Sequence, residues 1–189
     1  MTHLNLISAI LLLALPCLAL QCDNEKDKPK DNNKQEEATL PPATQTGEGT
    51  FGCKVNGEVW RPEAPPNINE LHADYYQDEF FVGADKRKDP KSNYTSMVIR
   101  VEDGFNEKGK YRLNGDLGNN YDMYASYSNV AGNCKYKTDS INTGKLTITH
   151  FDSAKRIVAG RFHFTAVIKQ GKCEKDTIRV TEGRFDIQD

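Results

Sequence analysis

Hydrophobic and polar positions divide the chain into three parts. A mainly apolar run extends from Leu6 to Leu20, residues 22–49 hold almost no apolar side chains, and apolar residues alternate with polar ones through much of 50–189. A period of two places apolar side chains on one face of a β-strand, and no window of this last part keeps the spacing of an amphipathic helix. The sequence therefore predicts one all-β domain over residues 50–189, which is a usual size for a single domain.

The clearest alternation lies near the C-terminus. Apolar side chains share one face through residues 157–168 and again through 177–187, where the phase slips by one at Glu182-Gly183. A β-bulge produces such a slip, because its extra residue re-aims the strand and glycine accepts the unusual φ. We predict a three-stranded antiparallel meander with a short turn at 152–155 and a longer loop at 170–175.

A hairpin is predicted at the start of the domain, around Asn56-Gly57. Apolar residues alternate through 51–55, and Asn-Gly favours a two-residue turn because both of its positions need positive φ. Such a turn places Cys53 opposite Trp60. Further strands are expected at 71–76, 79–85, 96–102, 109–113 and 121–128. We therefore expect an antiparallel two-layer sandwich of about eight to ten strands, with an up-and-down barrel as the alternative.

The apolar run near the N-terminus is typical of a secretory signal peptide. It is too short to span a bilayer comfortably, and it ends at Cys22, where a strongly charged segment begins. A cysteine at this boundary indicates lipid attachment, with 1–21 as the signal peptide and 22–49 as a disordered tether of about 30 Å reach. Cleavage after Ala19, which would give a soluble secreted protein, and an uncleaved anchor are the alternatives.

Charge excludes one class of partner. The predicted tether holds seven acidic residues and four lysines, which leaves the domain with 20 acidic and 21 basic residues. No basic stripe interleaved with aromatic residues occurs along the chain, so the sequence gives a nucleic-acid interface no electrostatic support.

Three cysteines remain in the domain, and they fit an oxidising compartment. Cys53 lies within an alternating strand and is expected to be a buried thiol, whereas Cys134 and Cys173 lie in polar stretches beside glycine. We predict a disulfide between Cys134 and Cys173, with three free thiols as the alternative. No paired Cys or His spacing suits a metal, and no nucleophile or metalloprotease motif occurs, so we expect neither metal nor cofactor nor catalytic residues.

The segment 114–122 is rich in oxygen-bearing side chains. Its candidate ligand-binding residues are Asp116, Asn119, Tyr121 and Asp122. Carboxylate and amide oxygens on a loop suit calcium, but the order of residues does not match an EF-hand, and an ordinary turn is the competing interpretation. On the following strand Tyr121 and Tyr127 share one face and Tyr124 lies on the other, so one exposed ring would be able to stack on a sugar or a protein partner.

Both ends of the domain resemble a known family. The segment LPPATQTGEGTFGCKVNGEVW and the closing segments GKLTITHFD, IVAGRFHFTA and DTIRVTEGRFDI are similar to a family of uncharacterised lipoproteins of Bacteroidota. The resemblance implies a mostly antiparallel β-domain at the cell envelope. The family has no established activity, so it assigns no functional residues. The acidic residues after Cys22 are also similar to signals that export such lipoproteins to the outer face of the outer membrane.

These observations favour a lipid-anchored envelope protein whose domain is a non-enzymatic binding or interaction module with a glycan or protein partner. A structural or accessory subunit of an outer-membrane assembly is the alternative, and an enzyme comes third.

The anchor generates the first testable prediction. Cys22→Ser should abolish lipid labelling and release the protein from membranes, because the acyl chains on this cysteine supply an affinity that the polar tether lacks. The measurement is metabolic fatty-acid labelling with membrane fractionation. A Cys22→Ser protein that stays membrane-bound, with a wild type that takes up no label, would contradict the lipoprotein interpretation.

Overall fold

The computed structural model describes residues 39–89, 94–102, 104–115, 123–130 and 132–188. Contacts separate the chain into residues 1–37 and 38–189, and all described residues belong to the second unit. They contain no helix, so nothing in the described part has the helical length and apolar character that crossing a bilayer would require.

In the described residues, eleven antiparallel strands form one continuous sheet. They are β1 (Thr50–Val55), β2 (Glu58–Trp60), β3 (Leu71–Tyr76), β4 (Glu79–Lys86), β5 (Thr95–Val101), β6 (Lys110–Leu113), β7 (Met123–Asn129), β8 (Cys134–Lys137), β9 (Gly144–Asp152), β10 (Ile157–Gln170) and β11 (Thr177–Gln188). The strand order is β2-β1-β11-β10-β8-β7-β5-β4-β3, with β9 and then β6 branching from β10. The all-β prediction is confirmed, with a sheet that is not closed into a barrel.

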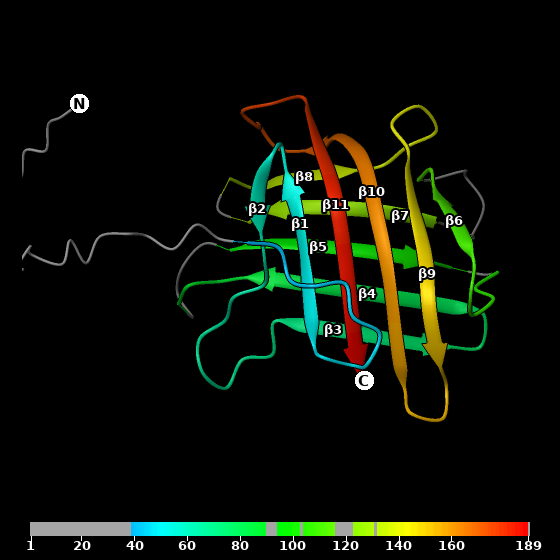
Figure 1. Cartoon of the computed structure of the whole chain (residues 1–189). Coiled ribbons are helices and arrows are strands. Elements are labelled where there is room, and N and C mark those ends of the chain that lie inside the picture. Colours follow the sequence, from blue (N-terminus) through cyan, green and yellow to red (C-terminus); the bar gives the residue numbers. More distant parts are fainter. Residues whose placement is uncertain (1–38, 90–93, 103, 116–122, 131, 189) are drawn as a thin grey trace, which may run out of the picture. The chain divides into compact units, whose positions relative to one another are not determined.

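The sheet folds over to make two layers. In Figure 1 β2, β1, β11, β10, β9 and β6 form the front layer and cross the strands of the back layer, β8, β7, β5, β4 and β3. Strand β10 serves both layers, because it pairs with β9 over Ile157–Phe164 and with β8 from Val167 onward. The result is a sandwich made from one sheet instead of two.

The first hairpin forms as its sequence predicts. Asn56 and Gly57 have φ values of 52° and 93°, and Cys53 lies opposite Trp60. The closing meander of β9, β10 and β11 is also confirmed by the pairing.

The predicted bulge in β11 is present, but its two residues have different roles. Glu182 carries the positive φ of 54°, not Gly183. Gly183 is needed for space, because a Cβ atom there would lie 2.5 Å from the ring of Phe162 on β10. The bulge lets the apolar residues on both sides of it face one core.

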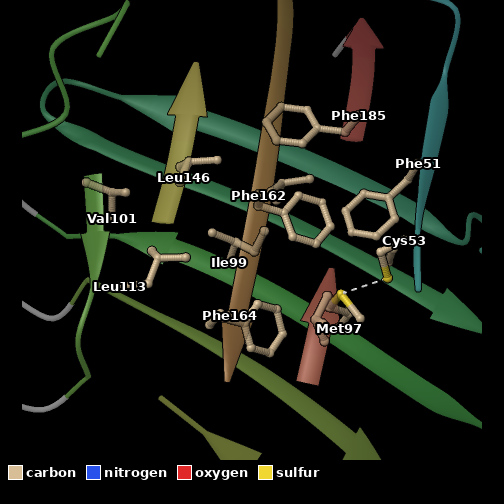
Figure 2. Packing of buried hydrophobic residues seen from close by; sticks show 14 of the residues in the cluster. Phe51, Cys53, Met97, Ile99, Val101, Leu113, Leu146, Phe162, Phe164 and Phe185 are labelled. Atoms are coloured by element: carbon tan, nitrogen blue, oxygen red, sulfur yellow. Dashed lines mark hydrogen bonds between the residues drawn. The ribbon is translucent and has the colours of Figure 1, made fainter. Parts of the chain in front are cut away.

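Aromatic rings from both layers fill the core between them. The Phe51 and Phe162 ring centroids lie 5.2 Å apart within the front layer, and Phe80 of β4 reaches Phe185 of β11 at 6.0 Å. Figure 2 shows the sulfur atoms of Cys53 and Met97 facing each other, 3.8 Å apart. Burial raises the pKa of the Cys53 thiol to about 12, so it stays protonated at neutral pH.

Residues 39–49, which the sequence assigns to the tether, lie against the domain. Figure 1 shows this segment crossing in front of β1 and β11. The carboxylate of Asp186 is 1% exposed and accepts hydrogen bonds from the backbone N–H groups of Thr46, Gly47 and Glu48 at 2.9, 2.8 and 3.3 Å. Three donors satisfy the buried charge, so this part of the segment is bound instead of free. Sequence alternation does not reveal such a contact, because Asp186 lies on the polar side of its strand.

The second prediction concerns this carboxylate. Burial alone would raise the pKa of Asp186, but the hydrogen bonds from residues 44–48 outweigh it and the pKa is lowered. A lowered pKa means that the ionised carboxylate stabilises the fold above the ordinary aspartate pKa, and that this contribution is lost as pH falls through the lowered value. Asp186→Asn should therefore lower the free energy of unfolding by about 2 kcal/mol near pH 7 and by less in acid.

The measurement is urea unfolding at several pH values, with limited proteolysis of residues 39–49. Asp176 is exposed, so Asp176→Asn serves as the matched control. It should change neither the free energy of unfolding nor the rate at which residues 39–49 are cleaved. If Asp186→Asn left both the unfolding and the proteolysis unchanged at pH 7, the carboxylate would not be what binds the segment.

Candidate functional site

A cleft of about 660 Å³ opens at one end of the sandwich. It lies between the β1–β2 hairpin and the loop 171–176 of the front layer and the ends of β5, β7 and β8 in the back layer. The two layers cross here, and no described strand fills the space between the hairpin and the ends of β5, β7 and β8. Its aromatic lining is Trp60, Tyr127 and Tyr136, and its charged lining is Glu58, Lys86, Lys88, Glu174 and Lys175.

One threonine fixes two of the three aromatic residues. Trp60 is 5% exposed, and its indole Nε1–H donates to the hydroxyl of Thr95 at 2.9 Å. Burial raises the pKa of Tyr127, and a hydrogen bond to the same Thr95 side chain partly offsets the rise. An aromatic floor that bridges β2, β5 and β7 is thus held by hydrogen bonds as well as by packing.

A disulfide and a hydrogen bond both hold the loop 171–176 at the rim of the cleft. The disulfide between Cys134 and Cys173 joins the start of β8 to this loop, with a Cα–Cα distance of 5.6 Å. The Tyr136 hydroxyl donates to the backbone carbonyl of Lys175 at 2.9 Å. Burial raises the pKa of Tyr136, and that hydrogen bond partly offsets the rise. The predicted disulfide therefore sits beside the cleft and fixes one of its walls.

The rim carries charges of both signs. Three lysines and two glutamates surround the aromatic floor, so the rim is close to neutral and rich in hydrogen-bonding groups. Such a surface suits a polar ligand with a ring or an extended backbone better than a purely apolar one. Within the described residues no group of His, Cys, Asp and Glu side chains is placed to hold a metal ion.

Most of the predicted site residues lie outside the described residues. These are Cys22, Asp116, Asn119, Tyr121 and Asp122. The structure does bring the two ends of the 116–122 loop together, because Gly115 N–H donates to the Met123 carbonyl at 3.0 Å.

The two following tyrosines lie on opposite faces of β7, as their spacing predicts. Tyr127 points into the cleft, where its ring centroid is 6.4 Å from that of Tyr136. Tyr124 lies on the other face, with the Lys137 ammonium 4.0 Å above its ring. Both rings are half-buried, and that of Tyr127 lines the candidate site.

The sequence did not predict the cleft. Trp60, Thr95 and Lys175 come from three distant segments and match no motif. One local signal was available, since the hairpin register placed the single tryptophan at the end of an edge strand. The register does not show which strand of the other layer that side chain would meet.

Comparison with known proteins identifies the second half of the domain. Residues 91–186 match the model of a family described as a domain of unknown function (DUF6252). The chain belongs to this family. The DUF6252 match contains Tyr127, Tyr136 and both disulfide cysteines, whereas Trp60 and its hairpin precede it. No curated protein and no solved structure matches the chain.

The disulfide gives the third prediction. Non-reducing peptide mapping should recover one linked pair that joins Cys134 to Cys173, while Cys53 reacts with alkylating reagents only after unfolding, since it is buried and protonated. Replacing both bridged cysteines with serine should lower the free energy of unfolding by about 2 to 4 kcal/mol without unfolding the domain.

Cys53→Ala is the matched control, because it removes a cysteine but keeps the bridge. Any peptide that links Cys53 to another cysteine would contradict the pairing.

Proposed function

We propose that this domain is the globular part of a lipid-anchored envelope protein and acts as a non-enzymatic binding module whose ligand occupies the cleft. The observation that carries the proposal is the aromatic floor of Trp60, Tyr127 and Tyr136, fixed in advance by Thr95 and by the Lys175 carbonyl. A preformed site binds without the cost of ordering its own side chains, which favours recognition.

The cleft lining favours a glycan or a peptide as the ligand. Both are polar chains that present ring or side-chain faces to aromatic residues and hydrogen-bonding groups to a mixed rim. The amide side chains of Asn56 and Asn129, together with Lys86 and Glu58, provide donors and acceptors around the opening.

The described titratable residues support binding more than catalysis. His72, His150 and His163 lie on β3, β9 and β10, and none of them lines the cleft. The free thiol of Cys53 is buried, and its pKa of about 12 leaves no thiolate to act as a nucleophile.

The proposed anchor is Cys22, which follows the signal peptide of residues 1–21. Because residues 39–49 are bound to β1 and β11, the tether of this proposal shortens to 22–38. The resemblance to Bacteroidota lipoproteins and the acidic residues after Cys22 support a place at the outer membrane.

A structural subunit of an outer-membrane assembly is the second candidate. Among the described strands β3 pairs only with β4, so its other edge meets no strand, and Tyr76 at its end is 70% exposed. An open edge with an exposed aromatic residue suits strand addition by a partner protein.

Photo-crosslinking in cells distinguishes the two candidates and forms the fourth prediction. A photoreactive amino acid replaces the exposed Lys88 at the cleft, Tyr76 at the β3 edge, or Lys135, which faces outward on β8 and serves as the control. We expect an adduct from position 88 and none from 76 or 135, because only the first position faces the proposed ligand.

Adducts from position 76 alone would favour the structural subunit and overturn the cleft proposal. Absence of any adduct at 88 in cells that express and anchor the protein would overturn it as well.

A further inference from the structure

A second surface of the domain concentrates positive charge. Strand alternation turns the polar residues of β6, β9 and β10 outward, away from the core. Five exposed residues on this side make up what we term the basic face: Lys110, Arg112, Lys145, Arg161 and His163. The domain as a whole is close to neutral, so this clustering results from the fold and not from composition.

The register places these residues beside one another in two rows. Arg112 pairs with Lys145, which pairs on its other side with His163. In the next row Arg161 lies opposite Arg184 of β11, and Lys110 is separated from it by Thr147. Like charges directly opposite each other destabilise a sheet. The pairing of Arg112 with Lys145 and of Arg161 with Arg184 therefore does not stabilise the sheet, which favours a role in binding.

No acid among the described residues neutralises the basic face. Within the described part of the chain none of its five residues forms an ion pair with an acidic side chain. The acidic residue of the neighbouring bulge, Glu182, pairs with Lys54 at 2.7 Å and with Arg184 at 3.9 Å. In the loop before β9, Asp139 pairs with Lys169 at 3.3 Å. The charges of the basic face are therefore available to interact with an anionic partner.

The charged side chains also surround a hollow. A depression of about 510 Å³ is lined by Lys110, Arg112, Lys145 and His163, with the hydroxyl of Thr143 at its edge. The bound segment 39–49 crosses β1 and β11 and does not extend over β9 in Figure 1. A concave site with one sign of charge focuses its field on an anionic group.

We propose that the basic face binds an acidic polysaccharide, a sugar chain that carries carboxylate or sulfate groups. Strands lie about 4.8 Å apart, so Arg112 and Lys145 offer two cations at that spacing, and the His163 imidazole adds a hydrogen-bonding group about 10 Å from Arg112, which suits repeated anionic groups. Thr147 and Thr165 add half-buried hydroxyls between the charges for the sugar hydroxyl groups. This surface is distinct from the cleft of the proposed function.

The composition of the basic face disfavours the other polyanions. Its hollow contains one tyrosine, Tyr111, and no other Phe, Trp or Tyr side chain, so it lacks the row of aromatic rings on which successive nucleic-acid bases stack. No aliphatic side chain lines the hollow, so the hollow itself offers no side chain to insert into a bilayer. What remains is a hydrated polyanion that binds by charge and hydrogen bonds.

The test measures binding of the full-length protein in detergent to dextran sulfate and to polygalacturonate. Lys145→Gln with Arg161→Gln removes two charges of the basic face, and Lys135→Gln with Lys172→Gln removes two exposed charges elsewhere as the matched control. We expect the first pair to weaken binding about tenfold and to reduce its salt dependence, and the control to change it less than about twofold.

Unfolding measured in parallel separates lost binding from lost structure. Because neighbouring cations repel, Lys145→Gln with Arg161→Gln should unfold at the same denaturant concentration as the wild type or a higher one. The crosslink from position 88 should be unaffected, so the two proposals succeed or fail independently.

Three results would overturn the proposal. One is equal weakening by both variant pairs, and another is no binding to either polysaccharide. The third is stronger binding to vesicles of phosphatidylcholine and phosphatidylglycerol, or to single-stranded DNA, than to both polysaccharides.

Discussion

Strand β10 hydrogen-bonds to three neighbours, and the two-layer arrangement depends on this. One side pairs with β11 from Ile157 to Val167, while the other pairs first with β9 and then with β8. The sheet therefore passes from one layer to the other through backbone hydrogen bonds instead of through a loop. Gly160 makes close packing possible, because a Cβ atom there would lie 2.6 Å from the ring of Phe185. The aromatic rings of both layers can then meet in one core.

The same fold-back produces the two surfaces to which we assign binding. Where the layers cross, the hairpin of β1 and β2 stands away from β5 and β7, and the aromatic cleft opens between them. On the outer side, Asp186 holds the segment 39–49 over β1 and β11 and leaves β6, β9 and β10 uncovered. Neither surface needs a sequence motif, since each arises from the way strands from distant parts of the chain are placed.

Sequence reasoning succeeded where the signal is local. The Asn56-Gly57 turn, the meander and the bulge each depend on residues within a few positions of one another, and turn chemistry and period-two alternation report them directly. The disulfide between Cys134 and Cys173 also followed from local context, because both lie in polar stretches beside glycine, whereas the sequence around Cys53 alternates clearly.

Sequence reasoning failed where a surface or a contact depends on the register between distant strands. Net charge near zero concealed the basic face, although the inward phase of Phe162 and Phe164 already implied that Arg161 and His163 point outward. Predicting a charged patch from these two residues would also have required the pairing of β9 with β6 and β10, which brings Lys110, Arg112 and Lys145 beside them. Binding of residues 39–49 was missed for a similar reason, since nothing near Asp186 shows that a segment so distant in the chain supplies its hydrogen-bond donors.

Hydrogen–deuterium exchange along β10 tests the central claim most directly. If one strand joins both layers, amides in the half that pairs with β9 and in the half that pairs with β8 should both be strongly protected and should open together under mild denaturant. Rapid exchange from Val167 onward, with slow exchange confined to residues 157–164, would mean that β8 and the back layer are not joined to β10. The single folded sheet and the cleft at its crossing would then be contradicted.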